Sequence, residues 1–147
     1  MDVHFTLTAS AKAPAGTMFD VVTDYPHYPR FNSAVLDVDV VQRDEDGAEF
    51  TTGQNTRTEK QVRTCDHYAK GGDLVVDRTY PLVSGDRSTW TIRPVDDEHC
   101  TLTVDADQSV PWLEGLMMRP LLRRTFFGSN LKPYIREAER RTRAATG

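Results

Sequence analysis

The chain has 147 residues, of which 38% are hydrophobic and 27% charged, and its formal net charge is −4. This length and composition exclude an intrinsically disordered protein and fit one domain, residues 1–147, with room for a core and an internal cavity. No apolar run approaches the ~20 residues of a membrane-spanning helix, and the first ten residues lack the regions of a signal peptide, so we expect a cytoplasmic protein.

The first expected elements are a strand and two short helices. Residues 3–11 alternate between apolar and polar side chains, a period of two that predicts an antiparallel strand with one solvated face. Apolar side chains recur at helical spacing in residues 14–22, which predicts a helix. Asp24 is a suitable N-cap for a second helix, which Pro26 and Pro29 keep short.

The middle of the chain alternates in a way typical of consecutive β-hairpins. Turn signals such as Asp46-Gly47 and Gly71-Gly72 separate the alternating segments. The expected strands are residues 34–40, 48–54, 61–69, 74–80, 88–95 and 100–108. Their regular order predicts a single meander sheet.

A helical pattern ends the chain. Apolar residues recur at three- and four-residue steps between residues 113 and 138, and Pro120, Gly128 and Pro133 interrupt them. We therefore expect either one long kinked helix or a short helix that leads into a longer one. A curved antiparallel sheet with its helices on one side is an α+β design, and the space between sheet and helix is a natural place for a hydrophobic cavity.

Basic residues are concentrated in this last segment. Residues 112–147 contain eight basic and three acidic residues, a net charge of +5, which leaves −9 for the first 111 residues. The late arginines can complement the dipole of the C-terminal helix, or they can form a docking surface for an acidic partner. Nucleic acid is not an expected ligand, because the rest of the chain is acidic and has no binding signature.

The cysteines and histidines do not predict a metal site. Cys65 and Cys100 fall in strand-like segments and are expected to remain reduced. Cys65 and His67 share one strand face, but two potential ligands are too few for a zinc site.

Three segments and the C-terminal helix carry a family resemblance. The segments are APAGTMFDVVTDYPHYPRF at 13–31, QRDEDGAEF at 42–50 and WTIRPVDDEHCTLTV at 90–104. In these the chain resembles the polyketide cyclase/dehydrase branch of the START-like (SRPBCC) helix-grip superfamily over nearly its whole length. The resemblance implies a curved antiparallel sheet of about seven strands around a long C-terminal helix, with two short helices after the first strand.

The resemblance also implies a ligand-binding cavity and leaves two functions open. One is a cofactor-free cyclase or aromatase that guides a polyketide or polycyclic intermediate through cyclisation and dehydration, as in antibiotic biosynthesis and other secondary metabolism. The other is a non-catalytic carrier of a lipid, quinone or similar metabolite. In a protein of this family, the acidic partner of the basic C-terminal helix would be an acyl carrier protein. Aromatase/cyclases of this branch place a tyrosine after the second short helix, whereas residues 32–35 contain none.

The candidate catalytic residues are Arg78, His67 and Tyr80. If residues 74 and 76 face inward, Arg78 and Tyr80 do so as well, and an inward arginine can stabilise an enolate. The alternative is that Arg78 reaches solvent at the rim. His67 would move protons, or it is an exposed strand histidine. The face of residues 61–69 that points inward stays open between Arg63, Cys65 and His67 on one side and Val62, Thr64, Asp66 and Tyr68 on the other.

The expected ligand-binding residues are large apolar, aromatic or hydrogen-bonding side chains at the wall or the lip of the cavity. They are Tyr28, Phe31, Phe50, Arg63, Trp90, Gln108, Met117, Leu121 and Phe127. Trp90 is either cavity wall or plain core, and Gln108 is either a ligand partner or a core amide.

Overall fold

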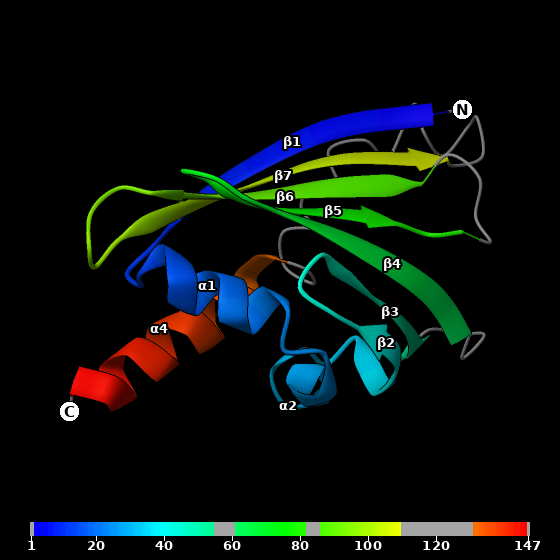
Figure 1. Ribbon diagram of the computed structural model, residues 1–147, viewed down its shortest axis with the longest axis horizontal. Coiled ribbons are helices and arrows are strands. Elements are labelled where there is room, and N and C mark those ends of the chain that lie inside the picture. Colours follow the sequence, from blue (N-terminus) through cyan, green and yellow to red (C-terminus); the bar gives the residue numbers. More distant parts are fainter. Residues whose placement is uncertain (1, 55–60, 82–85, 110–130, 147) are drawn as a thin grey trace.

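The computed structural model describes residues 2–54, 61–81, 86–109 and 131–146. Seven strands form one antiparallel sheet in the order β1-β7-β6-β5-β4-β3-β2. Their bounds are β1 Asp2–Ala11, β2 Val35–Arg43, β3 Gly47–Gln54, β4 Gln61–Lys70, β5 Leu74–Thr79, β6 Arg87–Pro94 and β7 Cys100–Ser109. The sheet is curved, and the described helices lie on one side of it (Figure 1). This confirms the predicted α+β meander sheet and its strands.

Two short helices follow β1, as expected. Helix α1 spans Ala15–Val22, and the 3-10 helix η1 (Tyr25–His27) leads directly into α2 (Tyr28–Phe31). The expected role of Asp24 is wrong in one respect, because its side chain makes no capping hydrogen bond to η1. The Asp24 carboxylate instead accepts hydrogen bonds from His27 Nδ1 at 2.8 Å and from Arg141 Nη2 at 2.6 Å.

Helix α4 (Lys132–Thr146) is the C-terminal helix and packs against α1. The Arg141 contact to Asp24 joins it to the turn between α1 and η1. The predicted helical pattern of residues 113–130 lies outside the described residues. None of the described helices is long and apolar enough to cross a membrane.

The core fills the space between the concave face of the sheet and the helices. Inward positions of the strands alternate with exposed ones, as Phe5 and Leu7 do with Thr6 and Thr8 in β1. The largest fully buried side chains are Trp90, Tyr25, Tyr28, Phe50, Met18, Ile92, Leu102, Leu131, Val21, Val22, Val76 and Val104. Aromatic residues of η1, α2 and β3 therefore enter the same core as the aliphatic residues of β6 and β7.

The β2–β3 hairpin turn shows why its Asp-Gly step is needed. The Asp44 carboxylate accepts hydrogen bonds from the backbone N–H groups of Asp46 and Gly47. A Cβ atom on Gly47 would lie 2.1 Å from the backbone oxygen of Asp66 in the neighbouring strand. The two strands can keep this spacing only with glycine at position 47.

We expect Gly47→Ala to destabilise the protein by roughly 1–3 kcal/mol, because β3 and β4 must separate to admit the methyl group. Gly71→Ala is the matched control, since a Cβ atom there has no neighbour within 4 Å. The control should change the free energy of unfolding by no more than about 1 kcal/mol, in the stabilising direction. Urea denaturation measures both. Equal stability of the two variants would contradict the close strand approach.

Candidate functional site

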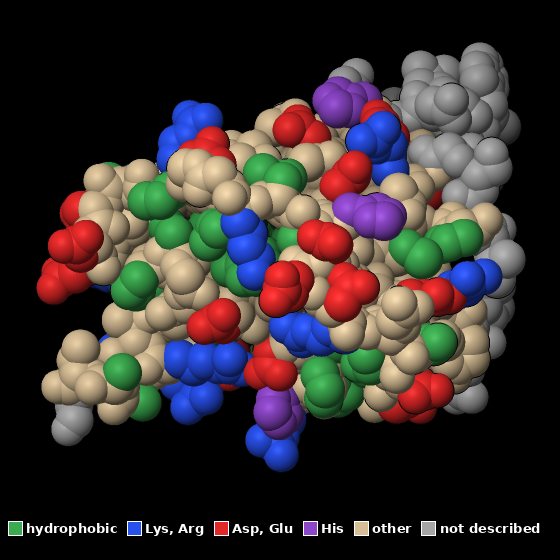
Figure 2. Space-filling view, in the orientation of Figure 1, with side chains coloured by type: hydrophobic (Ala, Val, Ile, Leu, Met, Phe, Trp, Pro, Cys, Tyr) green, Lys and Arg blue, Asp and Glu red, His purple; other side chains and the backbone are tan. Residues whose placement is uncertain are grey.

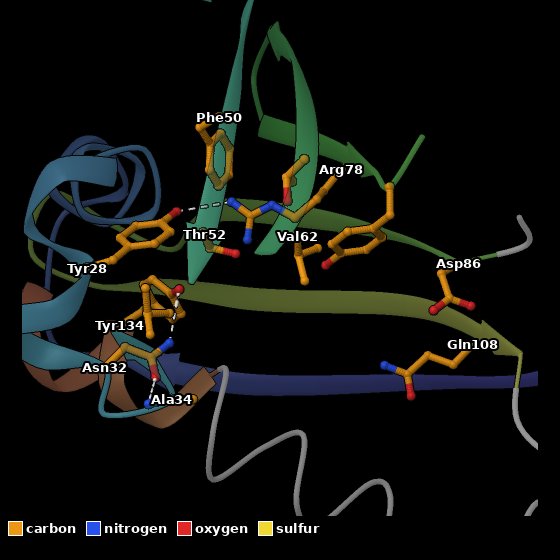
Figure 3. Close-up of a pocket in the computed structure, with 13 residues that line it drawn as sticks. Tyr28, Asn32, Ala34, Phe50, Thr52, Val62, Arg78, Asp86, Gln108 and Tyr134 are labelled. Carbon is orange, nitrogen blue, oxygen red and sulfur yellow. Dashed lines mark hydrogen bonds between the residues drawn. The ribbon is translucent and has the colours of Figure 1, made fainter. Parts of the chain in front are cut away.

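A pocket of about 290 Å³ lies on the concave side of the sheet. Its walls come from α2 and the segment that follows, from strands β2 to β5, from β7 and from α4 (Figure 3). The lining residues are Tyr28, Asn32, Ala34, Val35, Phe50, Thr52, Val62, Thr64, Arg78, Tyr80, Asp86, Gln108 and Tyr134. Aromatic rings and hydrogen-bonding groups are thus mixed in one small cavity.

Strands β4 and β5 bring two opposite charges into the protein interior. Asp66 and Arg78 are direct partners in the antiparallel register, so their side chains lie on the same face of the sheet. Arg78 Nε donates to Asp66 Oδ1 at 2.8 Å, and Nη2 donates to Oδ2 at 2.9 Å. The Arg78 side chain is 7% exposed and that of Asp66 is 0% exposed. The two charges therefore form a buried, bidentate ion pair.

Aromatic rings enclose the Arg78 guanidinium. Its carbon lies 5.5 Å from the centroid of the Phe50 ring and 5.2 Å from that of Trp90, within the range of cation–π attraction. Burial alone would lower the pKa of Arg78, but the Asp66 carboxylate, together with Tyr28 and Tyr80, outweighs this effect and raises the pKa well above the ordinary value. Arg78 is therefore a permanent, fixed cation in the wall of the pocket.

Two tyrosines, one from η1 and one from α2, extend this network to the short helices. Tyr28 Oη accepts a hydrogen bond from Arg78 Nη2 at 3.0 Å and donates one to the backbone oxygen of Val22. Tyr25 Oη donates to Asp66 Oδ2 at 2.7 Å, and it lies 2.5 Å from the hydroxyl of Tyr68. Side chains of η1 and α2 are thereby tied to the ion pair of the sheet.

Tyr134 of α4 and Asn32 close the pocket on the helix side. Asn32 Nδ2 donates to Tyr134 Oη at 3.3 Å, and Asn32 Oδ1 accepts from the backbone N–H of Ala34 at 3.0 Å. The Tyr134 ring packs edge-on against Tyr28 and Trp90, with centroids 5.2 and 5.3 Å away. The segment after α2 is therefore held against the start of α4.

The tyrosine hydroxyls in this pocket act as hydrogen-bond donors at neutral pH. Burial raises the pKa of Tyr28, Tyr80 and Tyr134 above the ordinary value. The pocket also contains the carboxylate of Asp86 and the amide of Gln108, which lie apart from the Tyr28 end in Figure 3. The arrangement suits a ligand that carries carbonyl or hydroxyl groups on an apolar frame.

The structure places Arg78, Tyr80, Tyr28, Phe50 and Gln108 at the pocket, where the sequence predicted ligand or catalytic contacts. Tyr28 is deeply buried rather than at the lip. The contribution of each residue to binding or catalysis stays a prediction.

Of the two faces of β4 that the sequence left open, the structure turns inward the one that does not carry His67 and Arg63. His67 is exposed, and Arg63 lies on the outer side with its Nε 2.5 Å from Glu49 Oε1. Neither residue lines this pocket. The inward positions of β4 are Val62, Thr64 and Asp66 instead, so the carboxylate and not the histidine faces Arg78.

Two further predicted ligand residues lie behind the pocket wall, and three lie outside the described residues. Trp90 is buried core, with its Nε1 donating to Ser88 Oγ at 3.0 Å. Phe31 packs against Tyr28 and Tyr134 but does not line the pocket. The predicted residues Met117, Leu121 and Phe127 belong to the undescribed segment.

Sequence reasoning missed several pocket residues. Thr52 shares the inward face of β3 with Phe50, so the period of two would have found it. Tyr134 appeared only as part of a helical pattern, and Asn32 and Asp86 lie in segments without periodicity. Among the described residues, no group of three or more His, Cys, Asp or Glu side chains is arranged to hold a metal ion.

Removing Arg78 alone should be far more damaging than removing both charges of the pair. Arg78→Met leaves the Asp66 carboxylate buried without its cation, and we expect a loss of about 3–5 kcal/mol. The double variant Arg78→Met/Asp66→Asn should recover much of this loss, since the neutral amide can still accept from Tyr25. Arg63→Met, at an exposed ion pair, is the control and should cost no more than about 1 kcal/mol. Urea denaturation compares the three, and a double variant no more stable than Arg78→Met would contradict the pair's burial.

The stability of the protein should fall as the pH rises above about 10. Burial raises the pKa of all five tyrosines, Tyr25, Tyr28, Tyr68, Tyr80 and Tyr134. The unfolded chain releases these protons near pH 10 while the folded protein retains them, so the free energy of unfolding decreases above that pH and is unaffected below it. Tyrosinate absorbance should show a midpoint near pH 10 in denaturant and a clearly higher one in the native protein. Coincident midpoints would refute this.

Comparison with known proteins agrees with the architecture. The Zhui aromatase/cyclase from Streptomyces sp. R1128 superposes with a TM-score of 0.72 at 18% identity, over 100% of this chain and 99% of that chain. The di-domain aromatase/cyclase StfQ from the steffimycin biosynthetic pathway gives 0.74 at 16% identity, over 97% of this chain and 52% of that one. Human STARD10 gives 0.66 at 15% identity, over 90% and 62%. These likenesses show the fold.

The family is shown by the sequence itself. No curated protein matches the chain. The family model for polyketide cyclase/dehydrase and lipid transport, however, matches residues 11–129, which is most of the chain. The resemblance seen in the three sequence segments is thereby confirmed. The protein belongs to the polyketide cyclase/dehydrase and lipid transport family.

Proposed function

We propose that the protein is a cofactor-free cyclase of the aromatase type, which binds a polyketide or related polycyclic intermediate in the pocket and promotes its cyclisation and dehydration. The observation that carries this proposal is the buried Arg78–Asp66 pair in the pocket wall. A fixed cation inside a small, largely aromatic cavity is a preorganised site for negative charge that develops on a substrate oxygen. Family membership and the likeness of fold to aromatase/cyclases support the same reaction class.

The proposed chemistry needs a cation, a base and a proton donor. Arg78 hydrogen-bonds a substrate carbonyl and stabilises the enolate formed when a methylene between two carbonyls loses a proton to Asp86. The enolate carbon then bonds to the carbon of a more distant carbonyl of the same chain, and Tyr80 protonates the resulting alkoxide. Protonated Asp86 then returns its proton to this hydroxyl, which leaves as water, while the Tyr80 phenolate takes another ring proton; the ring becomes unsaturated and both residues regain their starting protonation. The pocket holds the chain folded for this step.

A carrier function is the second candidate, and one specific observation favours it. Two of the three guanidinium nitrogens of Arg78 already bind Asp66 and Tyr28, and the pocket tyrosines are held in their protonated form. A pocket of this kind can hold a carbonyl-bearing lipid or quinone with no reaction.

The basic face of α4, which exposes Arg136, Arg140 and Arg143, is the proposed contact for an acidic acyl carrier protein.

The test compares turnover with affinity in folded variants. The double variant Arg78→Met/Asp66→Asn and the single variant Tyr80→Phe should each lower cyclised product by at least about 100-fold, because they remove the oxyanion donor and the proton donor. Product is measured by liquid chromatography and mass spectrometry with a synthetic poly-β-ketone thioester. Affinity is measured by calorimetry with a stable tricyclic phenol and should change only a few-fold. His67→Ala, outside the pocket, is the control and should retain wild-type turnover.

Two outcomes would refute the proposed enzymatic function. One is loss of affinity without any loss of turnover per bound substrate. The other is product formation by the wild-type protein at the uncatalysed rate, together with a co-purified apolar molecule in native mass spectrometry. The second outcome would establish the carrier function instead.

A further inference from the structure

A basic groove lies outside the pocket, between α2 and α4. It has a volume of about 500 Å³, and its walls include Arg30 and Phe31 of α2 and Pro133, Arg136 and Arg140 of α4. A neighbouring hollow of about 510 Å³ shares Arg30, Phe31, Glu137 and Arg140 with it. Figure 2 shows basic side chains and a histidine gathered where α4 and α2 reach the surface. We call the two hollows together the α2–α4 groove.

Some charged side chains of the α2–α4 groove form ion pairs with each other, and others do not. Glu137 accepts from Arg140 Nε at 2.5 Å and Nη2 at 3.2 Å, and its Oε2 lies 3.5 Å from Arg141 Nε. Arg141 also donates to Asp24. Both carboxylates of the groove are therefore neutralised by Arg140 and Arg141. Hydrogen bonds from Arg140 and Arg141 lower the pKa of Glu137 despite its burial, so its charge is fixed as part of the scaffold.

Two arginines of the groove have no such partner. Arg30 and Arg136 are exposed, and neither forms an ion pair with any residue that the structure describes. Together with the remaining N–H donors of Arg140, they present guanidinium groups on both sides of one groove. This local excess of positive charge occurs in a chain whose net charge is −4.

The lining of the groove includes apolar residues as well as arginines. They are Pro29 and Phe31 of α2 and Pro133 of α4. Phe31 is only partly buried, although its ring packs edge-on against Tyr134 at 5.5 Å. A ligand that fits must therefore combine an anionic group with an apolar part.

We propose that the α2–α4 groove binds a phosphate ester, with the phosphate between Arg30 and Arg136 and the organic part on Phe31. Arginine is suited to this group because its planar guanidinium donates two parallel hydrogen bonds to phosphate oxygens. The three oxygens of a phosphate ester can be shared by several guanidinium groups, whereas a carboxylate offers only two. The site is distinct from the Arg78 pocket and does not depend on the reaction proposed there.

Calorimetric titration with phenyl phosphate and with inorganic phosphate at fixed low ionic strength tests the site. Phenyl phosphate should bind saturably with a 1:1 stoichiometry and more tightly than inorganic phosphate, because its ring packs on Phe31. Arg30→Gln/Arg136→Gln should weaken phenyl phosphate at least about tenfold, since two charge-assisted hydrogen bonds are lost. Both residues are exposed, so the variant should remain folded.

The matched control is Arg87→Gln/Arg93→Gln, which removes the same charge from exposed positions of β6. It should bind phenyl phosphate within about twofold of wild type. Equal weakening in the two double variants would show that the effect depends on net charge alone, and would overturn the proposal. The absence of saturable binding would also overturn it.

A second arm identifies the source of the phosphate. Vesicles of phosphatidylcholine with phosphatidic acid should sediment with the wild-type protein, and not with the groove variant, if the ester is a lipid headgroup. Binding of phenyl phosphate without vesicle binding supports a soluble ester. Vesicle binding by the groove variant equal to that of wild type would exclude the groove as the lipid contact. Loss of groove binding with normal turnover at the pocket would leave the proposed cyclase function intact.

Discussion

The buried ion pair between Arg78 and Asp66 is the interaction on which the pocket depends. A guanidinium or a carboxylate removed from water costs several kcal/mol by itself, so each can stay charged only while the other is present. The pair joins facing positions of β4 and β5, while Tyr25 and Tyr28 extend it to η1 and α2. One interaction therefore fixes which face of β4 points inward and how the short helices sit on the sheet.

The same network determines what the pocket offers to a ligand. Both carboxylate oxygens of Asp66 accept hydrogen bonds, from Arg78 and from Tyr25, so the charge of Asp66 holds the cation in place. The donors that the wall offers include the guanidinium of Arg78 and the protonated phenol of Tyr80, with Asp86 as a carboxylate in the lining. These donors are complementary to carbonyl oxygens and to the negative charge that forms on them, whether the ligand reacts or is only held.

Alternation predicts the seven strands because their period of two is long and clear, but it does not decide the orientation of β4. Both faces of that strand mix polar with apolar or small residues, and only pairing across to β5 separates them: Asp66 lies opposite Arg78, and two opposite charges are buried together at a lower cost than one alone. The prediction that the Asp24 side chain caps the second helix was wrong for a related reason. Its partner Arg141 is 117 residues away in the sequence, so no local capping pattern contains it. Local patterns predict elements, whereas long-range charge pairs decide which polar residues enter the site.

Aromatic side chains in contact with each other lie between the pocket and the α2–α4 groove. Phe31 faces the groove, and its ring packs edge-on against Tyr28 and Tyr134, which line the pocket. Tyr28 in turn accepts a hydrogen bond from Arg78. Phe31 at the groove and Arg78 at the pocket are thus joined through Tyr28, by a ring contact on one side and a hydrogen bond on the other.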